Sequence, residues 1–131
     1  MHKNYEYLFR VDGSHNLGLG HIFRTKTLAK YLISKGKNTL YVFRENENVR
    51  RLIENIDYFT IKADIKLEEE LNIILNLVRK HQIKTIINDL LFYDEDYLES
   101  LSDFGVKLAT FHEDRISDPF SDLVINYNTF N

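Results

Sequence analysis

Two glycines stand directly before a histidine in the segment Gly18-Leu19-Gly20-His21, between a predicted strand and a predicted helix. Glycines at such a turn permit unusual backbone angles and let a ligand approach the main-chain N–H groups. The following helix presents its N–H groups and positive dipole end to an anion such as a phosphate. In its first turn, His21 is favoured in the neutral form that a general base needs. We therefore expect a small-molecule site here, with Arg24 as a phosphate contact.

The glycine spacing matches neither of two common nucleotide-binding motifs. Phe23 stands where the dinucleotide fingerprint would place its third glycine, and no Gly-Lys-Ser/Thr follows as a P-loop requires. A structural interpretation therefore stays open, in which the glycine-rich turn carries a helix-capping histidine and binds nothing.

The elements that would position this segment alternate between strand and helix patterns. Strands are expected at 5–11, 39–43, 58–61, 85–88, 106–111 and 123–126, and helices at 21–34, 47–55, 67–81 and 93–101. Gly36 is expected to end the first helix. The 67–81 helix shows an apolar stripe through Leu71, Ile74 and Val78, and Glu68, Glu69 and Glu70 occupy its first turn, where the dipole favours negative charge. This order predicts one α/β domain over 1–131, a Rossmann-like doubly wound parallel sheet.

In such a sheet, ligands bind beyond the carboxyl ends of the strands. Polar side chains follow nearly every expected strand and would meet on that one rim. They are Asp12, Ser14, His15 and Asn16, then Arg44 and Glu45, Asn88 and Asp89, His112, Glu113 and Asp114, and finally Asn126 and Asn128. Taken singly, each of Asp12, Asp89 and Asp114 is better explained as a turn former.

Composition excludes several classes of function. The chain has no cysteine, which rules out a disulfide framework or a thiolate metal site. The 17 basic and 20 acidic residues give a net charge of -3, which argues against a nucleic-acid partner. His112, Glu113 and Asp114 show no zinc-like spacing, so we expect no metal and no cofactor. No signal peptide or membrane-spanning run is visible, and a cytoplasmic location with no membrane partner is expected.

Taken together, the stretch from Arg10 to Leu32 resembles a known family. Arg10-Val11-Asp12-Gly13-Ser14, Gly18-Leu19-Gly20-His21-Ile22-Phe23-Arg24 and Leu28-Ala29 are similar to the N-terminal signature of the PseG/SpsG-type enzymes, UDP-sugar hydrolases of pseudaminic acid biosynthesis. Later segments agree in outline: 86–89, 111–114 and 122–128 stand where that family has strand ends and the close of its N-terminal domain. Leu90 follows Asp89 where an aromatic residue or histidine is common, and Glu113 replaces the first of two aspartates.

The resemblance implies a fold like the N-terminal half of a two-domain GT-B glycosyltransferase. It implies hydrolysis of a UDP-sugar by water at the anomeric carbon, without a metal, with His21 as the base. The loop at Gly18 and Gly20 would lie near the sugar and diphosphate, and Asp12, Asp89 and Asp114 would be candidates for substrate contacts.

Family members carry a second domain that holds most of the UDP. We therefore expect a C-terminal UDP-binding domain or partner chain, docked on an exposed apolar face for which Phe120, Tyr127 and Phe130 are candidates. Two alternatives stay open: the acceptor-side domain of a GT-B glycosyltransferase in surface polysaccharide biosynthesis, and a non-catalytic module that binds a nucleotide or a protein.

Overall fold

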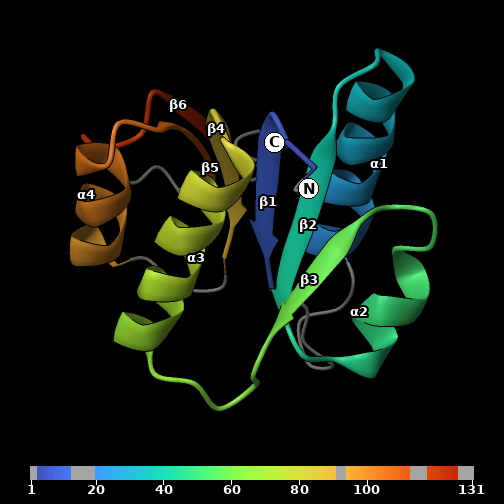
Figure 1. The fold of residues 1–131 in the computed structure, drawn as a ribbon, viewed down its shortest axis with the longest axis horizontal. Helices are drawn as coiled ribbons and strands as arrows, with labels where there is room; N and C mark the ends of the chain where they lie inside the picture. Colours follow the sequence, from blue (N-terminus) through green and yellow to red (C-terminus); the bar gives the residue numbers. More distant parts are fainter. Residues whose placement is uncertain (1–2, 13–19, 91–93, 113–117, 127–131) are drawn as a thin grey trace.

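The fold is a parallel sheet with helices on both faces, as the alternating pattern predicts (Figure 1). A computed structural model describes residues 3–12, 20–90, 94–112 and 118–126. In chain order the elements are β1 (Tyr7–Val11), α1 (Gly20–Ser34), β2 (Thr39–Arg44), α2 (Glu47–Leu52), β3 (Tyr58–Ile61), α3 (Leu67–His81), β4 (Thr85–Asp89), α4 (Glu95–Asp103), β5 (Lys107–His112) and β6 (Leu123–Asn126).

The sheet has the order β3-β2-β1-β4-β5-β6, and the pairings are all parallel. The order reverses between β1 and β4, which is the switch point where doubly wound sheets bind ligands. Their register pairs Arg10 with Asn88 and Val11 with Asp89, so the two strands end side by side. The Rossmann-like fold class expected from the sequence is confirmed.

Two hydrophobic cores lie on opposite faces of the sheet. In one, Leu8 and Ile86 pack with residues of α3 and α4, such as Ile74 and Leu98. In the other, Phe9 and Ile87 pack beneath α1 and α2, which Figure 1 shows on the opposite side of the sheet from α3 and α4. Since side chains alternate along a strand, every second residue of β1 and β4 faces the same pair of helices.

The element boundaries follow local capping chemistry. The side chain of Asn46 accepts hydrogen bonds from the N–H groups of Asn48 and Val49 and starts α2, which ends at Leu52 rather than at residue 55 as expected. Asn55 lies beyond that end with a φ of 70°, which a helix does not continue through. Asp94 caps α4 by accepting from the N–H of Tyr97, so the described helix begins at Glu95.

Phe120, Tyr127 and Phe130 are the residues expected to contribute to an exposed apolar docking face. Phe120 is partly buried and packs against the core shared by α3 and α4, while Tyr127 and Phe130 lie outside the described residues.

Within the described ranges, no helix is both long and apolar enough to cross a bilayer.

Candidate functional site

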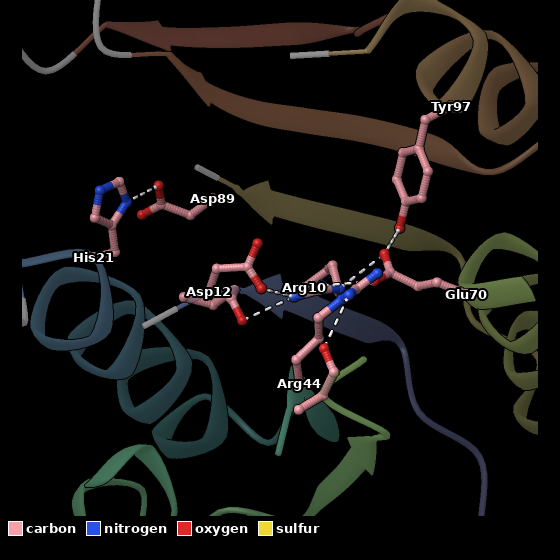
Figure 2. Close-up of polar contacts among 9 residues, drawn as sticks. Arg10, Asp12, His21, Arg44, Glu70, Asp89 and Tyr97 are labelled. Carbon is pink, nitrogen blue, oxygen red and sulfur yellow. Dashed lines mark hydrogen bonds and ion pairs between the residues drawn. The ribbon is translucent and has the colours of Figure 1, made fainter. Parts of the chain in front are cut away.

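A histidine, an aspartate and an arginine meet at the switch point of the sheet. Figure 2 shows the histidine and the aspartate of this group. Because α1 begins at Gly20, His21 lies in its first turn and Arg24 one turn further along. The side chain of Asp89, at the end of β4, lies on the same face of the sheet as α1. His21 Nδ1 lies 2.5 Å from Asp89 Oδ1, and Arg24 donates to both Asp89 oxygens, each bond being 2.8 Å.

The contacts assign the proton on His21. A carboxylate only accepts hydrogen bonds, so the short contact with Asp89 requires the N–H at Nδ1. Arg24 Nη2 also lies 2.8 Å from Nδ1, and an unprotonated Nδ1 would accept a hydrogen bond from it. In that case, however, the lone pair on Nδ1 would also face the negatively charged Asp89 carboxylate, which would repel it. This tautomer is inferred from the geometry, and it places the lone pair of the neutral ring on Nε2, on the side away from Asp89. The ring is thereby oriented as a base would need to be.

The partners of His21 are themselves well fixed. The Asp89 side chain is fully buried, whereas the side chains of His21 and Arg24 are 14% and 26% exposed. The Arg24 guanidinium also lies over the ring of Phe111 on β5, at 5.2 Å from its centroid. A bidentate arginine–carboxylate pair stacked on an aromatic ring holds a planar, specific geometry. The histidine of the three is therefore placed by two well-anchored neighbours.

On the other face of the sheet, Arg10 and Glu70 form a buried ion pair (Figure 2). Arg10 Nη2 donates to Glu70 Oε1 at 2.7 Å and Arg10 Nε to Oε2 at 3.1 Å. The Tyr97 hydroxyl donates to Oε2 at 2.7 Å, and Arg44 Nε donates to Oε1 at 2.9 Å. Arg10 Nη1 then donates to Asp12 Oδ1 at 2.7 Å. We call these five residues the Arg10 cluster.

Burial and charge act against each other in this cluster. Burial raises the pKa of Glu70, but the hydrogen bonds and charge of Arg10, with those of Tyr97 and Arg44, outweigh it and hold that pKa below its usual range. Burial lowers the pKa of Arg10, but Asp12 and Glu70 more than offset this and raise it. Burial and the Glu70 charge raise the pKa of Tyr97 well above its usual value. Glu70 is therefore ionised, and Tyr97 keeps the proton that it donates.

A third polar group follows β5. His112 is buried, with Nε2 at 2.9 Å from Asp118 Oδ2, and Asp118 also accepts from the Ser121 hydroxyl and from the N–H groups of Phe120 and Ser121. Burial raises the pKa of Asp118, but these bonds, that of His112 foremost, hold it below its usual range. Within the described ranges, no three side chains of His, Cys, Asp or Glu gather as metal ligands would.

The structure brings several expected site residues together. Asp12, Gly20, His21, Arg24 and Asp89 lie at the carboxyl ends of β1 and β4, and the N–H of Asp12 donates to the Asp89 carbonyl at 3.3 Å. Arg24, expected as a phosphate contact, is bonded to Asp89 instead of pointing away from the protein. Gly18 and Asp114 lie outside the described residues.

Sequence reasoning missed Glu70 and Tyr97 as members of a polar cluster. From the sequence, Glu70 is one of three acidic residues that suit a helix dipole, yet it is fully buried while Glu68 and Glu69 are exposed. The signal was present, because Glu70 stands four residues before Ile74 and eight before Val78, on the buried stripe of α3. A charged residue on an apolar stripe requires a buried partner.

The fold and this rim together define a doubly wound α/β domain with a histidine–aspartate pair at its switch point. No protein-family model matches the chain. The chain is similar to the uncharacterized protein MJ1062 of Methanocaldococcus jannaschii, with 29% identity over 118 residues. That alignment covers 88% of this chain and 23% of the relative, so the chain spans about a quarter of the length of the curated relative it matches.

Proposed function

We propose that this chain is the sugar-side domain of a UDP-sugar hydrolase, resembling the enzyme that hydrolyses UDP-2,4-diacetamido-2,4,6-trideoxy-altropyranose. The observation that carries the proposal is the contact between His21 Nδ1 and Asp89 Oδ1, which leaves the lone pair of the ring on Nε2. The motif from Asp12 to Arg24 adds the resemblance to PseG/SpsG-type enzymes. The absence of cysteine suits the cytoplasm, where we place the protein.

In the proposed step, His21 Nε2 takes a proton from a water molecule as the water oxygen attacks the anomeric carbon. The bond between that carbon and the phosphate oxygen breaks, and the bonding electrons leave with UDP. The remaining hydrogen of the water becomes part of the new anomeric hydroxyl. A positioned base of this kind contributes roughly 100- to 10,000-fold to the rate.

The other rim residues support that base or the substrate. Asp89 and Arg24 position His21, because both Asp89 oxygens accept hydrogen bonds within this group. We assign Asp12 to the sugar, and the backbone at Gly18 and Gly20 to the sugar and diphosphate. Asp114 remains a predicted substrate contact. UDP itself would be held by a C-terminal domain or a partner chain.

Binding is tested first, by amide NMR of this chain with a UDP-linked acetamido sugar at millimolar concentration and with UDP alone as the comparison. We expect the sugar conjugate to shift signals of Asp12, Gly20–Arg24 and Asp89, and UDP alone to shift them far less. A folded chain whose rim signals do not respond to either compound would contradict the proposal.

Chemistry is tested with the UDP-binding half supplied, in water enriched in ¹⁸O. We expect the label in the released sugar, and His21→Asn to lower turnover by about 100- to 10,000-fold. His81→Asn is the matched control, because His81 also bonds through Nδ1 but lies at the far end of α3. The chain alone is expected to turn over little, since the nucleotide loses most of its contacts.

Two results would favour the alternatives. Sugar transferred intact to an acceptor would indicate a glycosyltransferase, in which His21 deprotonates a hydroxyl group rather than water. Full activity of His21→Asn would indicate a module that binds without doing chemistry.

A further inference from the structure

The Arg10 cluster has no part in the proposed proton transfer, although it contains two completely buried charges. The side chains of Arg10 and Glu70 have no exposed surface, and Arg44 is 28% exposed. Each nitrogen of the Arg10 guanidinium donates a hydrogen bond, to Glu70, to Asp12 or to the Val11 carbonyl. Its position is therefore fixed from three directions.

Burying charged side chains in this way costs desolvation free energy. Burying an ion pair costs several kcal/mol per ion in desolvation, and apolar residues of similar volume often serve stability equally well. The cluster is balanced only as a whole, because two guanidinium groups face the carboxylates of Glu70 and Asp12. Stability alone does not explain why the hydrogen bonds of the Arg10 cluster extend to Asp12, just beyond the carboxyl end of β1.

Asp12 is the member of the cluster that reaches the rim. It is the first residue after β1, its side chain is 13% exposed, and its N–H bonds to the carbonyl of Asp89. Oδ1 is held by Arg10, whereas within the described ranges Oδ2 accepts no hydrogen bond from the protein. Figure 2 shows Asp12 lying between Arg10 and the pair of His21 and Asp89.

We propose that Arg10 is a positioning residue, clamped by Glu70, which holds Asp12 as a hydrogen-bond acceptor for a hydroxyl or amide N–H of the sugar. This inference rests on the proposed function. A carboxylate repels a diphosphate and accepts from neutral donors. Asp12 would therefore select the glycosyl end of the substrate, and sugars that lack the matching donor would bind more weakly.

A ligand-free experiment tests the clamp itself. In Glu70→Gln, we expect NMR signals of the Arg10 Nε–H and of the Asp12 amide to shift, since the neutral carboxamide no longer offers Arg10 a charged, two-oxygen partner. Asp57→Asn is the control, because Asp57 also accepts from a lysine and a tyrosine but lies away from β1's carboxyl end. Unmoved Arg10 and Asp12 signals in folded Glu70→Gln would overturn the clamp, whatever the chain binds.

A double-mutant cycle tests what the clamp does for binding. Asp12→Asn can still accept from Arg10 through Oδ1, but it places an amide group where Oδ2 would accept from the sugar. We expect Glu70→Gln and Asp12→Asn each to weaken binding of the UDP-linked acetamido sugar about tenfold, and the double variant also about tenfold. Binding of UDP alone is expected to be unchanged.

The outcomes separate this inference from the proposed function. Effects that multiply to about 100-fold would show that Glu70 does not act through Asp12, and an unaffected affinity in Glu70→Gln would do the same. If Glu70→Gln does not fold, Tyr97→Phe removes one bond to Glu70, and its smaller loss of affinity, about twofold, should disappear in the Asp12→Asn background. If the unaltered chain does not bind the sugar conjugate, the proposed function fails, and the ligand-free shifts still decide the clamp.

Discussion

At the scale of single residues, the rim depends on which nitrogen of His21 carries the proton. The carboxylate of Asp89 decides this, and Arg24 holds the carboxylate in place by donating to both of its oxygens. His112 offers a comparison within the same molecule, because it pairs with Asp118 through Nε2 rather than Nδ1. Both histidines therefore contact a carboxylate, but His21 does so through Nδ1 and His112 through Nε2.

Asp89→Asn is expected to reverse the tautomer of His21. The amide of asparagine can turn its N–H₂ toward Nδ1, which then accepts, and the ring proton moves to Nε2. We expect ¹⁵N NMR of the imidazole to show a protonated Nε2, and turnover in the complete cleft to fall by about 100- to 10,000-fold. Asp118→Asn should alter the signals of His112 and leave those of His21 unchanged. An unaltered His21 tautomer in Asp89→Asn would contradict this account.

At the scale of elements, the sequence predicts those whose apolar pattern and ends agree. The run Ile86-Ile87 predicts a strand buried on both faces, and both residues are buried in β4. Gly36 has a φ of 81° just beyond α1, as expected for a glycine that ends a helix. The 47–55 prediction extends three residues too far because it counts Asn55 as helical, whereas its positive φ places it beyond the helix, a position that asparagine often occupies.

The candidate site was predicted only in part, since its contacts join residues distant in sequence. The helix start at Gly20 and the strand end at Asp89 could each be read locally, but their contact depends on the pairing of β1 with β4. Glu70 was assigned to the helix dipole because sequence alone does not show that Arg10 lies opposite it. The periodicity of apolar residues shows which face of a helix is buried. Which residue that face contacts depends on how the strands and helices are arranged in the fold.

The end of α3 offers a prediction at this scale. Gln82 caps the helix with φ 55° and ψ 44°, a left-handed conformation that costs an ordinary residue about 1–2 kcal/mol. Gln82→Gly should therefore raise the free energy of unfolding by about 0.5–1 kcal/mol, although the greater freedom of glycine in the unfolded chain offsets part of the gain. Urea unfolding measures this, with Lys80→Gly inside the same helix expected to destabilise by about 1 kcal/mol. A Gln82→Gly variant less stable than the parent would show that the bond from Asn4 to Gln82 matters more than the backbone.

At the scale of the whole molecule, the carboxylates of Glu70, Asp118 and Asp57 are among those that join separate elements of the described chain. Glu70 ties α3 to β1 and β2, Asp118 ties the segment before β6 to β5, and Asp57 ties Lys3 and Tyr5 to the segment before β3. The hydrogen bonds of Lys3 and Tyr5 lower the pKa of Asp57, so all three carboxyl groups have a depressed pKa in the folded chain. Protonation of these carboxyl groups at low pH therefore weakens contacts in several separate parts of the fold.

The sign of the resulting pH dependence follows from these depressed values. A carboxyl group whose folded pKa lies below its unfolded pKa, which is about 4, stabilises the fold above that pH. The stabilisation is lost as the pH falls from the unfolded pKa through the folded pKa, because over that range the unfolded chain binds more protons than the folded chain. We expect the urea midpoint to be steady near neutral pH and to fall below about pH 4. Asp118→Asn should flatten this fall, whereas Glu99→Gln, an exposed change of equal charge, should not. Equal unfolding free energies at about pH 7 and about pH 3 would mean that these contacts do not stabilise the folded chain through the ionised carboxylates. The Arg10 cluster would then not contribute to the free energy of unfolding in this way.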